Sequence, residues 1–467
     1  MTFDPNGDPE NPLEWPLPFK WGIIALLCCM SFTVTFTCIS VVPLASHIVA
    51  DLDHGRGSKS ASVLLVTIWE LGESVGPLAL APLSEIFGRY KVINAANILF
   101  ILAVALAAMS QNSGFFIGTR ALTGLVVAGN VLNPAVVGDI LLPEQRGFAL
   151  TFIQIAPLLG GAIGPVISGA LAQTLGWRKV MWICVALAGS CEVIFLTYFR
   201  ETYPRAILKR RAKKLREGSD SGADALLDTR PLLDGGLGEK GGSWESTMRP
   251  AAILSSSLVL GILSLFNSVA FSFFYVMSVT LPDVLEEIYG LSPAATGSAF
   301  LGFTLGSVLS TLMCNRSLDK VYVLRREANG GIGLPEFRLP LSVVGSVMLP
   351  LSIALFGWII CLQLPLVLLV LSVAFLGFSL MLASLPIMAY VVDAFGLYSA
   401  SAITGIIVTR CLMGTFLPLS VQPLVGSFGY GWGFMVLGGI SLLLAPIPML
   451  VMRYGPQWRQ RTSYTRN

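Results

Sequence analysis

The chain has 467 residues, of which 54% are hydrophobic and only 12% are charged. A soluble globular protein carries about a quarter charged residues, so this composition excludes an ordinary soluble enzyme and indicates a protein embedded in lipid. The formal net charge of +3 gives no general basic surface, so we expect no nucleic-acid partner.

Long apolar runs recur from one end of the chain to the other. A hydrocarbon core of about 30 Å needs roughly 20 mostly apolar helical residues. The first runs of this length cover residues 21–46, 61–82, 92–110, 115–138, 148–172 and 179–199. The others cover residues 252–281, 295–314, 340–361, 365–390, 398–420 and 432–452. We therefore predict an all-α integral membrane protein with twelve transmembrane helices in two six-helix bundles.

A long polar segment, residues 200–250, separates the two sets of runs. It opens with RETYPRAILKRRAKKLRE, which predicts a basic amphipathic helix on the membrane surface, and continues with a Gly, Ser and Asp stretch typical of a flexible linker. The predicted domain order is a tail (1–20), an N-terminal bundle (21–199), the linker (200–250), a C-terminal bundle (251–452) and a second tail (453–467).

The distribution of basic residues predicts the orientation in the membrane. With the N-terminus inside, most of the 30 lysines and arginines fall on the inner side, and the outer side holds only Arg56, Lys59, Arg178 and Lys179. Cytoplasmic loops carry such an excess of positive charge, so we expect both tails and the linker to be cytoplasmic.

Several short sequence motifs follow one another along the chain. In the first half they are DPENPLEWPLPFKW (8–21), GPLALAPLSEIFGRYK (76–91), RALTG (120–124), LLPEQRG (141–147) and LLGGAIGPVISG (158–169). In the second half they are YGLSPAATGSAFLG (289–302), PEFRLP (335–340) and YVVDAFGLYSASA (390–402). Together with the segment after residue 199, they resemble the major facilitator superfamily, and within it the fungal twelve-span drug:proton antiporters.

The resemblance implies a proton-coupled antiporter that exports small organic molecules such as drugs, toxins or secondary metabolites by alternating access. It implies a monomer in lipid, in the plasma membrane or alternatively the vacuolar membrane. A proton-coupled importer, a polyamine exporter and a non-transporting sensor with the same fold are the alternatives. The sequence carries no phosphate-binding loop, Ser/His/Asp arrangement or metal-ligand spacing, so we expect no enzyme activity, cofactor or metal.

Acidic residues inside the apolar runs are candidates for proton coupling. An ionised side chain at the bilayer centre costs about 2.5 to 3.5 kcal/mol even on lenient scales, so such residues usually face a cavity and act. Glu70 and Glu73 lie one helical turn apart in WELGESVGP. Mutual repulsion and burial predict that at least one of them holds a proton part of the time. The alternative is a polar patch that braces the kink at Gly76 and Pro77.

Arg120 occupies the position of an arginine that the resemblance links to proton coupling. A fixed positive charge can tune the protonation of a neighbouring acid, while the alternative is a structural ion pair between two helices. Arg410, Asp139 and Asp393 form a second group of candidates. For Glu192 we expect an interhelical hydrogen bond rather than a coupling role.

Two stretches are candidates for gating. The inner loop with Glu85, Gly88, Arg89 and Lys91 is predicted to latch the halves in the outward-facing state through weak charge pairs, or simply to anchor the chain. In LLGGAIGPVISG, the residues Gly160, Gly164 and Pro165 allow close helix approach and bending. The resemblance places this second stretch where the two halves meet, and ordinary helix packing is the alternative.

Aromatic and sulfur side chains suit a deformable cavity for planar solutes. The candidates are Trp69, Phe274, Tyr275, Met388 and Tyr390, although lipid contact or core packing is the commoner role of such residues. The two histidines, His47 and His54, both lie near an outer loop, so we expect no histidine chemistry.

Overall fold

The computed structural model describes residues 8–55, 57–127, 129–218 and 243–460, and the regular structure in these ranges is helical. The first half contains α1 (Leu17–Ile39), α2 (Ala45–Leu52), α3 (Lys59–Phe87), α4 (Arg89–Ala108), α5 (Ser113–Leu125), α6 (Gly129–Ile140), α7 (Pro143–Leu175) and α8 (Trp177–Tyr198). The linker contributes α9 (Pro204–Gly218) and α11 (Ser243–Ser256). The second half contains α12 (Leu258–Glu287), α13 (Pro293–Ala328), α14 (Pro340–Cys361), α15 (Leu366–Phe395), α16 (Ser399–Phe416), α17 (Val421–Leu444) and α18 (Ile447–Arg459).

Twelve membrane crossings follow from these helices. Among the described residues, ten helical stretches are long and apolar enough to cross a membrane. One of them, Ser399–Arg459, contains two crossings, because α16 is followed by the short 3-10 helix Leu417–Ser420 and then by α17 and α18. The remaining crossing consists of α5 and α6, each too short to span alone. Twelve helical crossings in two bundles were predicted, and the fold confirms them.

Several predicted helix bounds are wrong in detail. The run 115–138 is divided into α5 and α6, and glycines at 124 and 129, which are poor helix formers, flank the break. The run 21–46 is divided between α1 and α2. The run 252–281 starts in α11, and α12 begins only after Ser257, whose hydroxyl accepts a hydrogen bond from the backbone N–H of Leu260.

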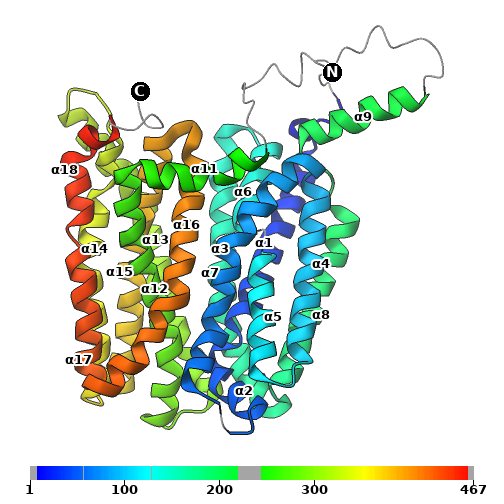
Figure 1. Cartoon of the computed structure of the whole chain (residues 1–467). Coiled ribbons are helices and arrows are strands. Elements are labelled where there is room, and N and C mark those ends of the chain that lie inside the picture. The colour runs from blue at the N-terminus through cyan, green and yellow to red at the C-terminus, as the bar shows by residue number, and fades with distance from the viewer. Residues whose placement is uncertain (1–7, 56, 128, 219–242, 461–467) are drawn as a thin grey trace.

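The helices form two bundles that lie side by side (Figure 1). In the first, α1 packs on α7, α3 on α5 and α4 on α8. In the second, α15 packs between α13 and α14, and α12 packs on α16. The halves meet mainly along two seams, α7 with α13 and α3 with α16. Any change in the relative position of the halves must therefore alter these two seams.

Small residues make the seam between α7 and α13 close. A Cβ atom at Gly297 would lie 2.1 Å from the carbonyl oxygen of Pro165, and one at Gly169 would lie 2.3 Å from the carbonyl oxygen of Pro293. Both contacts are with backbone atoms of the opposite helix, which have little freedom to move aside. Only glycine fits at these two positions in this arrangement.

The two linker helices lie at one end of the bundles (Figure 1). α9 extends away from the first bundle, and Arg211 on it forms an ion pair of 2.6 Å with the buried Asp8 of the N-terminal segment. α11 lies across the second bundle and contacts both α16 and α3. The predicted Gly, Ser and Asp linker falls largely at residues 219–242, outside the described residues.

Candidate functional site

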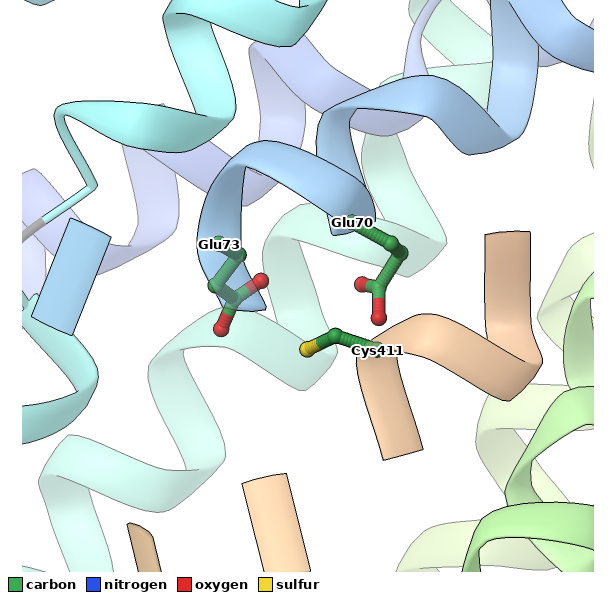
Figure 2. A group of neighbouring side chains, drawn as sticks. All are labelled: Glu70, Glu73 and Cys411. Carbon is green, nitrogen blue, oxygen red and sulfur yellow. The ribbon is translucent and has the colours of Figure 1, made fainter. Parts of the chain in front are cut away.

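The two acids of α3 lie at the centre of the molecule. Glu70 and Glu73 stand near the middle of this 29-residue helix, and each residue is only 1% exposed. Figure 2 shows both carboxylates turned toward Cys411, which lies on α16 of the other half. Ligand atoms from these three side chains lie within 4.8 Å of one another. The acid pair therefore sits on the seam between the halves.

Both acids contact residues of the second half. The hydroxyl of Tyr275, on α12, donates a 2.5 Å hydrogen bond to Oε1 of Glu70. The Nη2 atom of Arg410, on α16, lies 3.8 Å from Oε1 of Glu73. The same guanidinium lies over the ring of Phe271, 4.3 Å from its centroid. Two carboxylates on one half are thus opposed by a phenol and a guanidinium on the other.

The charged side chains of this cluster do not balance when all of them are ionised. With both carboxylates ionised, Glu70, Glu73 and Arg410 carry a net charge of −1 in a buried site, and one bound proton makes the group neutral. Burying an unbalanced charge is costly. Carboxylates and a thiol can also bind divalent metals, but the fixed charge of Arg410 beside Glu73 disfavours a cation. The cluster is thus a buried group of two carboxylates, a thiol and one guanidinium on the seam between the halves.

Further contacts fix the register of α3. The hydroxyl of Thr67 donates a 3.2 Å hydrogen bond to the carbonyl of Thr415, and the Thr415 hydroxyl donates one of 3.5 Å to the carbonyl of Thr67. On the opposite side of α3, Cβ atoms at Gly72 and Gly76 would lie 2.2 Å from carbonyl oxygens of α5. Gly76, expected to be part of a kink, therefore serves close packing.

Arg120 is fully buried in the first half. Its Nη2 atom donates a 2.7 Å hydrogen bond to the carbonyl of Cys38, and its Nε atom donates one of 3.4 Å to the carbonyl of Leu65. The guanidinium thus links α5 to α1 and α3 through backbone carbonyls. Its third nitrogen, Nη1, has no hydrogen-bond partner among the described residues. Arg120, Glu70 and Glu73 all act electrostatically on the thiol of Cys38.

The inner loop makes its contacts within the first half. Arg89 forms a 3.3 Å ion pair with Asp139, also bonds to Ser84, and its backbone N–H donates a 2.7 Å hydrogen bond to Glu201. Gly88 has a φ of +94°, and a Cβ atom there would lie 2.1 Å from the Glu201 carboxylate. The contacts of Arg89 thus hold the loop to its own bundle.

Two further residues of this loop, Glu85 and Lys91, are exposed. Glu85 acts on the phenol of Tyr203, whose ring lies 4.9 Å below the Arg89 guanidinium. Burial raises the pKa of this phenol, and the negative charge of Glu85 adds to the effect.

A related cluster occupies the same end of the second half. Arg338, in the 3-10 helix Pro335–Arg338, forms ion pairs of 2.5 Å with Asp393 and 2.9 Å with Asp319. Asp139 and Asp393 are therefore each paired with an arginine of their own bundle, away from the central acid pair.

The glycines of α7 serve two different contacts. Cβ atoms at Gly160 and Gly164 would lie 2.5 and 3.0 Å from the carbonyl oxygens of Phe32 and Phe36, so these glycines pack α7 on α1 within one half. Pro165 instead contacts Gly297 across the seam. Only the later part of this motif therefore lies between the halves.

The aromatic candidates separate into three groups. The ring centroid of Phe274 lies 5.0 Å from that of Tyr275 and 4.8 Å from that of Phe303. Phe274 therefore belongs to the group of aromatic side chains beside the acid pair. Trp69 lines a cavity of about 50 Å³ inside the first half. Met388 and Tyr390 belong to a separate packed cluster of the second half with Leu260.

Glu192 bonds as expected to a neighbouring helix. The side-chain amide of Asn97, on α4, donates a 2.7 Å hydrogen bond to its carboxylate. This pair lies inside the first bundle rather than on the seam.

Comparisons with known proteins agree with this architecture. The sequence pattern of the Major Facilitator Superfamily matches residues 24–418. The chain is 30% identical to the efflux pump radE of Floropilus chiversii, covering 99% of this chain and 85% of that protein. It is 31% identical to the MFS transporter cpaT of Aspergillus oryzae, with coverage of 99% and 92%.

Among solved structures, a D-xylose-proton symporter superposes with a TM-score of 0.68 at 17% identity, covering 94% of this chain and 97% of that one. This likeness concerns the fold. From the family pattern, the curated relatives and the twelve-crossing fold together, the chain belongs to the Major Facilitator Superfamily and is a membrane transporter rather than an enzyme.

Proposed function

We propose that this transporter exports small organic molecules, such as drugs, toxins or secondary metabolites, in exchange for protons. The observation that carries the proposal is the buried pair Glu70 and Glu73, which contacts Tyr275 and Arg410 of the other half. The name of the similar protein radE, an efflux pump, supports the direction of transport. We place the protein in the plasma membrane as a monomer with cytoplasmic termini.

The proposed coupling follows from the position of the acids on the seam. An ionised Glu73 attracts Arg410 and holds α3 to α16, whereas a protonated Glu73 loses most of this attraction. Proton binding therefore changes how strongly the halves are joined at the centre. A substrate that competes with the proton for these carboxylates must carry a hydrogen-bond donor or a positive charge. Such competition produces exchange rather than co-transport.

The substrate can be found without assuming its identity. An untargeted comparison of the metabolites retained by a deletion strain and by its parent should show an organic, partly apolar compound of a few hundred daltons. Purified full-length protein in lipid vesicles should then transport this compound in the direction opposite to the flow of protons down an imposed gradient. Transport should stop when the gradient is collapsed. Retention of an inorganic ion or a large peptide, or transport that ignores the gradient, would contradict the proposal.

Arg120 is expected to be needed for transport of this compound. In Arg120→Ala the two carbonyl contacts are lost, and in Arg120→Lys one ammonium group replaces a planar fork that reaches two helices. We expect rates at least about tenfold lower for Ala, corresponding to a loss of roughly 1.4 kcal/mol, and an intermediate rate for Lys. Gradient-driven transport in vesicles, at equal protein level, measures both. Unchanged rates in both variants would remove Arg120 from the mechanism.

A further inference from the structure

Three polar contacts join the halves at the end opposite α9 and α11. The hydroxyl of Ser46 donates a 2.9 Å hydrogen bond to Asp283, and Nε2 of His47 lies 3.2 Å from Oε2 of Glu286. At the start of α3, Nζ of Lys59 lies 3.6 Å from Oε1 of Glu287. In each pair one residue belongs to the first half and the other to the end of α12. By the orientation given above, this is the outer end.

The outer medium reaches these contacts. The His47 side chain is 57% exposed and that of Glu286 is 25% exposed. A cavity of about 200 Å³ between the halves is lined by Ser62 and Lys59 on one side and by Asp283 and Gln422 on the other. This is space for several water molecules. Protons of the outer medium can therefore exchange with His47.

The charges around His47 favour its protonated form. Glu286 and Asp283 on α12 act on it directly, and Glu287 lies in the same turn of helix. Lys59 is an opposing cation in these surroundings, and Arg178 pairs with Asp51 of the His47 helix. An acidic neighbour that bonds to an imidazole stabilises the imidazolium over the neutral ring.

Other titratable groups face the same region. His54 follows the His47 helix and acts on Asp51, and Tyr430 of α17 interacts with Asp283 and Glu287. The charge of His54 acts on Asp51, whereas that of His47 interacts with the acids of α12. His54 therefore offers a matched control for His47.

We propose that His47 is a proton-responsive latch at the outer gate, holding the gate closed through Glu286 when charged and releasing it when neutral. The charged contact is present at low pH and is lost as the pH rises through the titration of the imidazole. An acidic exterior thus favours closure of the outer gate. The proposal assumes the alternating access of the proposed function but needs no proton exchange at Glu70 or Glu73.

Cysteine accessibility tests the latch. Ser62→Cys places a thiol in the outer cavity, and a membrane-impermeant maleimide reports how often that cavity opens. The full chain in lipid nanodiscs is labelled across the titration range of histidine, with the chain lacking the added cysteine as background. Thr174→Cys, at an exposed position, corrects for the pH dependence of the thiol reaction itself. Labelling of Ser62→Cys relative to this reference should rise about two- to fivefold from acid to alkaline pH, the range expected for one exposed ion pair.

Substitutions at the two histidines show which of them produces the pH dependence of labelling. His47→Gln should give fast labelling without pH dependence, His47→Lys slow labelling without pH dependence, and Glu286→Gln should also abolish the response. His54→Gln should retain the profile of the unaltered chain. A profile retained in His47→Gln, or lost in His54→Gln alone, would overturn the proposal. The Glu70→Gln and Glu73→Gln double variant should keep the response while losing coupling, so failure of the latch and failure of the proposed function are separable.

Discussion

Replacing Glu70 and Glu73 together by glutamine is expected to abolish the response of efflux to the proton gradient while the protein remains folded. Glutamine keeps the size of the side chain and its hydrogen bonding but cannot titrate. The Tyr275 contact can persist, whereas Arg410 loses its charged partner. Without a titratable carboxylate the site cannot exchange a proton, so gradient-driven exchange should fall at least about hundredfold, equivalent to roughly 2.7 kcal/mol.

The single variants should identify the residue that exchanges the proton. One of Glu70→Gln and Glu73→Gln should lose gradient dependence and still bind substrate, measured as efflux in vesicles and as equilibrium binding. Glu192→Gln is the matched control, because this buried acid accepts a hydrogen bond from Asn97 inside the first bundle. It should retain gradient-driven efflux. Retained pH-dependent transport in the double variant would instead pass the coupling role to Asp139 or Asp393.

The sequence predicts the acids of this site but not their partners. Glu70 and Glu73 stand out because lipid disfavours charge within an apolar run. Tyr275 and Arg410 lie more than 200 residues away, and Tyr275 resembles any other aromatic residue of a membrane helix. Their pairing with the acids depends on how α3 meets α12 and α16. That packing is a tertiary property that the pattern of one helix does not contain.

The same reasoning explains the other differences. From the sequence no histidine chemistry is expected, because His47 and His54 both lie near an outer loop, whereas the fold brings Glu286 of the other half to the side of His47. Met388 and Tyr390 share the composition of a cavity wall but pack inside one bundle. The close approach of α5 to α3 is a further tertiary feature, since a Cβ atom at Gly124 would lie 1.8 Å from the carbonyl oxygen of Trp69. Apolar length alone carries no information about such contacts.

Gly297→Ala is expected to stop transport by preventing closure of the outer end. The added methyl group would lie 2.1 Å from the carbonyl oxygen of Pro165 and 3.0 Å from the Cα atom of Val166, and neither can turn away as a side chain can. Overpacking of this kind costs about 1 to 3 kcal/mol, which exceeds the roughly 1 kcal/mol limit of an exposed pair such as His47 with Glu286. The added methyl group should therefore oppose closure more strongly than the outer latch favours it.

The expected readouts of Gly297→Ala are loss of efflux and faster labelling of Ser62→Cys at every pH. Gly169→Ala should behave in the same way, because it obstructs the same seam from α7. Gly189→Ala is the control: a Cβ atom there meets nothing within 4 Å, so efflux and labelling should be unchanged. If Gly297→Ala were folded and transported normally, α7 and α13 would have to separate without cost. The outer gate would then be held by the polar contacts of α12 alone, and His47→Lys should change efflux more than either glycine variant.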